Sequence, residues 1–214
     1  MSATSPRADI ILCAQRMNAL RINRGTSGNV SARIEGGFLI TPTALAYDAL
    51  QPEDIVEMTL DGGIRGMGRP SSEWRFHRDI YAARPEVGAI VHAHSPFATT
   101  LSCLGRGIPA FHYMVALAGG DDIRCATYAT FGTQQLSDQV LAAIQDRKAC
   151  LMANHGMIAV GESLDEALAL AVEVEALAEQ YARALQIGQP HLLSADEMRR
   201  VLESFQTYRG QSAG

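Results

Sequence analysis

Short apolar runs and tight turns follow one another closely in the first part of the chain. Residues 29–34 alternate in polarity, Gly36 and Gly37 make a turn, and residues 38–41 are apolar, which together are typical of a β-hairpin. A second hairpin is expected over residues 55–64. Strands joined by tight turns pair antiparallel, whereas parallel strands need a crossover connection of about a dozen residues or more. The sequence therefore predicts a largely antiparallel sheet and excludes a doubly wound parallel one.

Helical patterns follow and interrupt these strands. Apolar residues recur at helical spacing over residues 8–23, and Ser-x-x-Glu capping boxes at Ser163 and Ser194 begin helices that end near residues 187 and 208. The remaining expected elements are helices over residues 96–104 and 133–146 and strands over residues 89–94, 123–127 and 149–153. We therefore expect an α/β protein of three layers, with a mostly antiparallel central sheet flanked by helices, and with residues 1–214 as one domain.

Composition excludes several classes of function. The formal net charge is -5, so no basic field can hold a nucleic-acid backbone or an anionic membrane. No apolar run approaches the roughly 20 residues of a membrane helix, and the N-terminal residues lack the apolar core of a signal peptide. The four cysteines lie far apart, as expected of reduced thiols. We expect a cytoplasmic protein with no nucleic-acid or membrane partner.

Three histidines are candidate metal ligands. His92 and His94 lie two residues apart on an expected strand, so their side chains project from the same face and can bind one ion. The alternative is a polar strand face, but this strand is otherwise apolar, and buried neutral histidines need partners. His155 follows another apolar run and can complete a trio. Three histidines leave a coordination position open, as in catalytic zinc sites that act as Lewis acids.

Glu73 is the candidate acid or base. It is expected in the first turn of a helix that follows Ser71 and Ser72 and ends before Pro85. At that position an acidic residue can simply complement the helix dipole. Beside a metal and screened from water, it can instead remove a proton next to a carbonyl group. The two serines are either N-caps or hydroxyl donors to an anion at the helix N-terminus.

Two further segments allow both a structural and a functional interpretation. Residues 25–29 form a turn of small residues that offers backbone amides and the Thr26 hydroxyl to an anion, although turn formation alone also explains it. Tyr113 lies in a loop from which it can donate a proton, although packing is the simpler explanation. Tyr128 and Phe131 suggest an aromatic wall.

Together these motifs strongly resemble the class II aldolase family of L-fuculose-1-phosphate aldolase and L-ribulose-5-phosphate 4-epimerase, over nearly the whole chain. The motifs are Gly25-Thr26-Ser27-Gly28-Asn29-Val30-Ser31, Thr41-Pro42-Thr43, Ser71-Ser72-Glu73, His92-x-His94 and Asn154-His155-Gly156. Those that look most like the fuculose-phosphate aldolase branch are His112-Tyr113-Met114, Ala118-Gly119-Gly120 and Ala129-Thr130-Phe131-Gly132-Thr133. The resemblance thus rests on a set of motifs and on no single one.

The resemblance implies a metal-dependent enzyme. His92, His94 and His155 would hold Zn²⁺, or another divalent ion such as Mn²⁺ or Co²⁺. Glu73 would be the acid/base that moves the proton on the carbon beside the ketone. The family forms fourfold-symmetric homotetramers with active sites between subunits, so Tyr113 would reach a neighbouring subunit's metal site and protonate the aldehyde-derived oxygen.

The resemblance also implies a substrate site for a small phosphorylated sugar. Its expected residues are Thr26, Gly28, Asn29, Thr43, Ser71 and Ser72 for the phosphate, Phe131 for the aldehyde, and Tyr208 in a mobile C-terminal tail. The expected substrate is L-fuculose 1-phosphate, 5-deoxyribulose 1-phosphate or 5-methylthioribulose 1-phosphate. Reversible cleavage would give dihydroxyacetone phosphate and an aldehyde through a zinc-stabilised enediolate.

Other residues bear on the mechanism and the substrate. Lys148 is the only lysine and lies outside every motif, which excludes a Schiff-base aldolase. Ala44 stands where the fuculose-phosphate enzyme has glycine, and Ser27 and Asn154 also differ from it, which leaves the aldehyde open. The alternatives are a pentulose-phosphate 4-epimerase, whose branch has aspartate at the position of Glu73, and a non-catalytic adducin-like binding domain. A metal-dependent hydrolase would use the same three histidines.

Overall fold

The protein is built on one mostly antiparallel sheet. A computed structural model describes residues 5–211, except for the side chains of residues 206 and 208–211. The strands are β1 (Asn29–Ile34), β2 (Gly37–Ile40), β3 (Val56–Thr59), β4 (Ile64–Arg65), β5 (Ala89–Ala93), β6 (Cys125–Ala126), β7 (Ala149–Met152) and β8 (Gly156–Gly161). They form an 8-stranded sheet in the order β4-β3-β2-β1-β5-β8-β7-β6. Only the β6–β7 pair of this sheet is parallel, so the expectation from the hairpins is confirmed.

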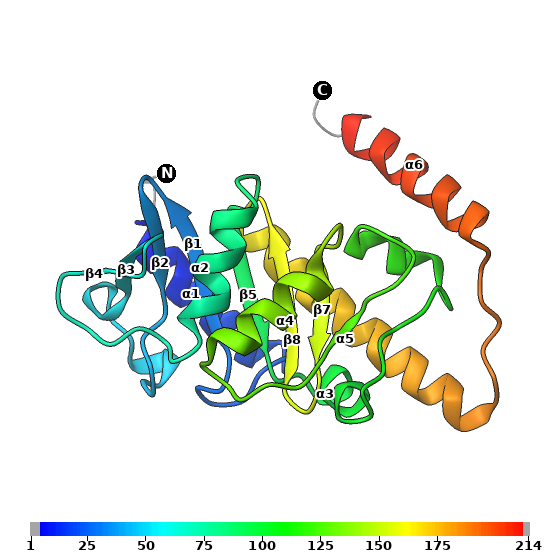
Figure 1. Ribbon diagram of the computed structural model, residues 1–214, viewed down its shortest axis with the longest axis horizontal. Coiled ribbons are helices and arrows are strands. Elements are labelled where there is room, and N and C mark those ends of the chain that lie inside the picture. Colours follow the sequence, from blue (N-terminus) through cyan, green and yellow to red (C-terminus); the bar gives the residue numbers. More distant parts are fainter. Residues whose placement is uncertain (1–4, 212–214) are drawn as a thin grey trace.

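Helices cover both faces of the sheet. They are α1 (Pro6–Ala19), α2 (Trp74–Ala83), α3 (Pro96–Cys103), α4 (Gln134–Ile144), α5 (Leu164–Ile187) and α6 (Ala195–Gln211), with the 3₁₀ helices η1 (Tyr47–Ala49), η2 (Pro52–Asp54) and η3 (Tyr113–Ala118). α2 and α4 lie on one face, and α1 and α5 lie on the other (Figure 1). Each face of the sheet buries its own apolar cluster against these helices. The three-layer architecture is therefore confirmed.

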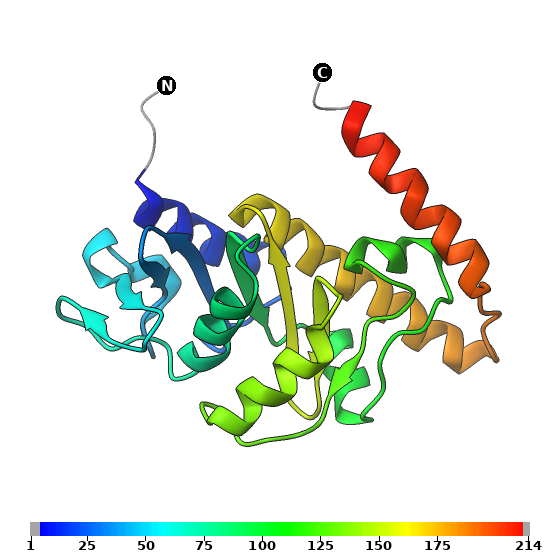
Figure 2. The same ribbon diagram turned by 45° about the horizontal axis from the view of Figure 1, so that its top comes forward.

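Local capping explains where the C-terminal helices begin. The Ser163 hydroxyl accepts a hydrogen bond from the Glu166 backbone at 3.3 Å, and the Ser194 hydroxyl accepts one from the Glu197 backbone at 3.2 Å. α6 stands apart from the three layers and contacts the rest of the protein mainly beside η3 (Figure 2). No helix in the described part of the chain is long and apolar enough to span a bilayer.

Two observed strands differ from the expectation. β6 contains only Cys125–Ala126, where the sequence predicted residues 123–127. β8 was not predicted, although it pairs with both β5 and β7. Most of its residues are buried whichever face they point to, so it shows no alternation between polar and apolar residues. This strand completes the centre of the sheet, and the turn before it holds one of the candidate ligands.

Candidate active site

The central strand β5 positions the first two histidines. His92 pairs with Asn29 of β1 on one side and with Ile158 of β8 on the other, so its backbone is fixed by two neighbours. His94 follows the last residue of β5 and projects from the same face. The two Nε2 atoms lie 3.0 Å apart. The His-x-His motif therefore converges as predicted.

The turn between β7 and β8 brings His155 to the same place. Asn154 has a left-handed conformation with φ 56°, which turns the chain tightly before β8. A Cβ atom on Gly156 would lie 2.5 Å from the Ala93 carbonyl oxygen, so this turn approaches β5 as closely as only glycine allows. The ring centroids of His155 and His94 are 4.8 Å apart.

Glu73 joins the three histidines in one cluster. Its Oε2 lies 3.1 Å from His92 Nε2, and its Oε1 lies 3.1 Å from His155 Nε2. One ligand atom from each of the four residues, including His94, lies within 4.8 Å of the other three. The cluster combines nitrogen and oxygen donors, which is a donor set suited to Zn²⁺ and to other divalent transition metals.

The surroundings of the cluster leave its donor atoms free for a metal. His92 Nδ1 lies 2.9 Å from the Met157 carbonyl oxygen, so Nδ1 carries the proton and the Nε2 lone pair faces the cluster. Burial, together with His92 and His155, lowers the pKa of His94 to about 3, which keeps its imidazole neutral. Glu73 Oε1 is buried and accepts no hydrogen bond. A buried acceptor without a donor fits a position next to a cation.

The electrostatics of Glu73 favour the carboxylate form. Its side chain is buried, with 5% of its surface exposed. Burial raises the pKa of Glu73, but the imidazoles of His92 and His155 lower it by more, so it lies below its ordinary value. The Asn29 amide adds a hydrogen bond to Oε2 at 3.0 Å. Glu73 is therefore an ionised group whose Oε2 is held by Asn29 and whose Oε1 is without a hydrogen bond.

The start of α2 differs from the expectation for Ser71 and Ser72. Neither serine is the N-cap, because α2 begins at Trp74 and Glu73 occupies the N-cap position. Ser71 instead forms a turn before the helix: its hydroxyl accepts from the Glu73 backbone at 3.3 Å, and its carbonyl accepts from the Trp74 backbone at 3.2 Å. Glu73 thus lies just before the helix, and its side chain points toward the histidines.

A second loop runs beside this turn. The Ser71 backbone donates to the Thr41 carbonyl at 3.0 Å, and the Thr43 backbone donates to the Arg69 carbonyl at 3.1 Å. Ala44, which follows, has φ 59°. This left-handed conformation costs a residue with a Cβ about 1–2 kcal/mol. Glycine, which the fuculose-phosphate enzyme has at this position, avoids that cost.

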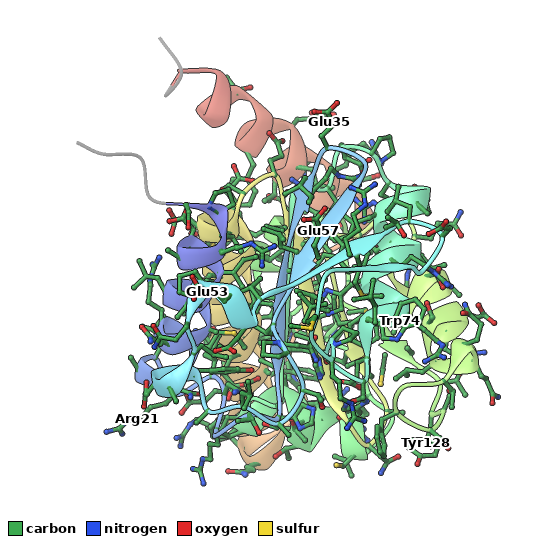
Figure 3. All side chains as sticks on the ribbon, turned by 90° about the vertical axis from the view of Figure 1, so that its left-hand side faces the viewer. Arg21, Glu35, Glu53, Glu57, Trp74 and Tyr128 are labelled. Carbon is green, nitrogen blue, oxygen red and sulfur yellow. The ribbon has the colours of Figure 1, made fainter. Side chains whose placement is uncertain are left out.

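A cavity of about 260 Å³ opens over the cluster. Its lining consists of Ser27, Ser72, Glu73, His94, Tyr128, Ala129, Phe131, Asn154 and His155. Tyr128 is 57% exposed and lies at the periphery of the molecule in Figure 3. The polar cluster therefore forms the deep end of the cavity, and aromatic side chains form its rim.

Comparison with known proteins identifies the family. Residues 8–182 match the family model described as "Class II Aldolase and Adducin N-terminal domain". The chain belongs to the class II aldolase family. Among curated proteins, this class II aldolase is 59% identical over 202 residues to the "5-methylthioribulose-1-phosphate/5-deoxyribulose-1-phosphate aldolase" of Rhodospirillum rubrum. The match covers 94% of this chain and 91% of that protein.

Two further relatives carry a different substrate name. The class II aldolase is 48% identical over 200 residues to the "L-fuculose phosphate aldolase" of Escherichia coli strain K12, and the match covers 93% of each chain. A solved structure named "L-fuculose 1-phosphate aldolase" superimposes with a TM-score of 0.92 at 36% identity, covering 96% of this chain and 98% of that one. These relatives establish that the protein is an enzyme of the aldolase type.

The structure of this class II aldolase assembles some expected site residues and leaves others apart. Ser72 and Phe131 line the cavity beside Glu73 and two of the histidines. Thr26 is exposed, and Tyr113 is 48% exposed on η3, outside the cavity lining. The side chain of Tyr208 lies outside the described residues.

Three residues that line the cavity were given no functional role by the sequence analysis. Ser27, Ala129 and Asn154 line the cavity of the class II aldolase. Ser27 and Asn154 lie within motifs, next to Gly28 and His155, and adjacency was the only signal that pointed to them. Asn29 was expected to bind phosphate, but in the structure its amide donates to Glu73.

Proposed function

We propose that this class II aldolase reversibly cleaves a ketose 1-phosphate with an apolar end, such as 5-methylthioribulose 1-phosphate or 5-deoxyribulose 1-phosphate, to dihydroxyacetone phosphate and an aldehyde. The observation that carries the proposal is the convergence of three imidazoles and the Glu73 carboxylate at the deep end of one cavity. Tyr128, Ala129 and Phe131 give the cavity an apolar side, which suits a methyl or methylthio group better than a further hydroxyl.

The substrate assignment is tested by comparing three ketose 1-phosphates. We expect kcat/KM for 5-methylthioribulose 1-phosphate and 5-deoxyribulose 1-phosphate to exceed that for L-fuculose 1-phosphate by about tenfold or more, because an apolar wall leaves a substrate hydroxyl without a partner. Coupled assay of dihydroxyacetone phosphate release measures all three. A higher kcat/KM for L-fuculose 1-phosphate would contradict this assignment and leave the reaction class intact.

We propose that His92, His94 and His155 hold a Zn²⁺ ion, with Mn²⁺ or Co²⁺ as possible substitutes. A bound divalent ion would polarise the substrate carbonyl and stabilise negative charge on the neighbouring oxygen atoms. The chain supports this site through the donor set and through the Met157 carbonyl, which fixes the tautomer of His92. We also propose a cytoplasmic location, with which the four free cysteines agree. Residues 1–214 are proposed to form one domain.

Glu73 transfers the proton on the carbon next to the ketone. In cleavage, the bond between the third and fourth carbons of the ketose breaks, and its electron pair forms an enediolate. In the addition direction the Glu73 carboxylate removes a proton from the third carbon of dihydroxyacetone phosphate. In cleavage Glu73 first takes up a proton from solvent between turnovers and then donates it to the third carbon, which yields dihydroxyacetone phosphate and restores the carboxylate. Its burial keeps water away from this step.

The phosphate site is proposed at the two loops beside the start of α2. Thr43, Ser71 and Ser72 lie on loops joined by backbone hydrogen bonds, and Ser72 faces the cavity. The turn with Thr26 and Gly28 lies next to β5, because Gly28 packs against the His92 carbonyl. Hydroxyl and backbone donors at the start of a helix favour a phosphate group.

Tyr113 is proposed to act on the site of a neighbouring subunit in a homotetramer. In addition its phenol would donate a proton to the aldehyde-derived oxygen and become a phenolate, and in cleavage the phenolate would take the proton of the substrate's fourth-carbon hydroxyl and become a phenol again. Two observations support a role across an interface: Tyr113 is 48% exposed, and it does not line its own subunit's cavity. Phe205 of α6 packs 6.3 Å from it, between ring centroids, so α6 lies beside this surface.

Mixed tetramers test this arrangement. Tyr113→Phe should lower kcat about 10- to 100-fold, because it removes a group that transfers a proton. Equal amounts of Glu73→Gln and Tyr113→Phe subunits, unfolded and refolded together, should regain activity at about a quarter of the sites, since that fraction would pair intact Glu73 with an intact neighbouring Tyr113. Each variant refolded alone is the control. No recovery in the mixture would contradict a role across the interface.

A further inference from the structure

A chain of hydrogen bonds leads from Glu73 away from the cavity into the protein interior. Asn29 donates to Glu73 Oε2 at 3.0 Å, and the Asn29 Oδ1 atom is bonded to His77 Nε2. His77 Nδ1 lies 2.7 Å from the Ser31 hydroxyl, which lies 2.8 Å from the Tyr81 hydroxyl. All five side chains are buried, and those of His77 and Ser31 have no exposed surface.

Regular secondary structure builds this chain. Asn29 and Ser31 lie two residues apart on β1 and face the same side of the sheet, the side that α2 covers. His77 and Tyr81 lie four residues apart on α2, so both point toward that strand. The Phe76 ring stacks on His77, with centroids 4.7 Å apart. The chain therefore crosses an apolar layer between a strand and a helix.

Its direction is fixed from the Glu73 end. An ionised carboxylate only accepts hydrogen bonds, so Asn29 must present its NH₂ group to Glu73 and its carbonyl oxygen to His77. His77 Nε2 then carries the proton. Burial lowers the pKa of His77 to about 3, so the ring is neutral and its Nδ1 accepts from the Ser31 hydroxyl.

We propose that His77 is a positioning residue of this aldolase: it fixes the orientation of the Asn29 amide, and through it holds the Glu73 carboxylate toward the substrate. This inference rests on the proposed role of Glu73 as the proton-transfer group. Without the His77 N–H, the Asn29 amide is free to rotate, and its oxygen can then face the carboxylate and repel it. Apolar side chains could fill the same layer, but they would give Asn29 no orientation.

Two matched variants separate positioning from packing. In His77→Gln, the side-chain amide nitrogen reaches the place of the His77 Nε2 and can still donate to Asn29. In His77→Asn, the amide reaches only the place of Nδ1, so Asn29 loses its partner. We expect kcat within about threefold of wild type for His77→Gln and lower by about 10- to 100-fold for His77→Asn, with a smaller change in KM. Zinc content, measured by atomic absorption, should remain the same in both.

A control variant accounts for loss of stability alone. The Ser137 hydroxyl is buried on the same side of the sheet and donates to Asp79 at 2.6 Å, with no connection to Glu73. Ser137→Ala should lower the midpoint of urea unfolding without lowering kcat. Equal kcat values for His77→Gln and His77→Asn would overturn the inference. An inactive wild-type enzyme would instead contradict the proposed function.

A spectroscopic measurement tests the chain without relying on catalysis. In metal-free wild-type protein labelled with ¹⁵N-histidine, the His77 signals should show a proton on Nε2 and none on Nδ1 near neutral pH. The His77→Gln spectrum assigns them among the six histidines of the chain. A proton on Nδ1 would reverse the direction of the chain and overturn the inference, whatever the kcat values of the two variants.

Discussion

Glu73→Gln should lower the rate of ketose 1-phosphate cleavage by about 10²- to 10⁴-fold, the usual contribution of a positioned proton-transfer group. Glutamine has nearly the same shape as glutamate, and its amide oxygen can still accept the hydrogen bond from Asn29. It cannot hold and return a proton at working pH. The measurement is kcat for release of dihydroxyacetone phosphate by the zinc-loaded protein.

Metal content is the control for this variant. Because the three histidines are untouched, Glu73→Gln should bind zinc in the same proportion as wild type, and its unfolding midpoint should stay close to that of wild type. A second control is exchange of the dihydroxyacetone phosphate proton with deuterated water, which should fall as far as cleavage does. Cleavage at the wild-type rate would exclude Glu73 as the acid/base.

Gly28→Ala should damage both stability and activity. A Cβ at this position would lie 2.5 Å from the His92 carbonyl oxygen and 2.9 Å from Asn23 Oδ1, closer than real contacts allow. The His92 carbonyl belongs to β5, so relief of the clash must displace either the 25–29 turn or the strand that holds His92 and leads into His94. We expect the free energy of unfolding to fall by about 1–3 kcal/mol, as overpacking of a core usually costs.

Gly188→Ala provides the comparison for this substitution. Gly188 follows α5, and no atom lies within 4 Å of a Cβ built there. Its effect on urea unfolding and on zinc content should be small. If Gly28→Ala were as stable and as active as Gly188→Ala, the close approach of the 25–29 turn to β5 would be contradicted.

Local patterns predicted much of the architecture and the convergence of the histidines. The Gly36 turn and the alternation of residues 29–34 were enough to predict antiparallel pairing, because a short connection allows no other. His92 and His94 could be placed on one face because the side-chain period of a strand is two. Their predicted convergence with His155 is observed in the structure.

Contacts between distant segments could not be predicted from local patterns. Asn29 lies opposite His92 because β1 pairs with β5, and nothing in residues 29–34 indicates which strand is the partner. The donation from Asn29 to Glu73 depends on that pairing. His77 falls in a helical stripe with Ile80 and Tyr81 that is typical of a buried apolar face, and only the structure places it within a polar chain, between Asn29 and Ser31. β8 lacked a pattern because both of its faces are buried.

The most direct test of the central claim is release of dihydroxyacetone phosphate from 5-methylthioribulose 1-phosphate, before and after removal of metal by a chelator. The three-histidine site predicts that the chelated protein loses activity and that added Zn²⁺ restores it. Full activity in protein shown to be metal-free, or no release by zinc-loaded protein from any of the three ketose 1-phosphates, would contradict a metal-dependent ketose-1-phosphate aldolase.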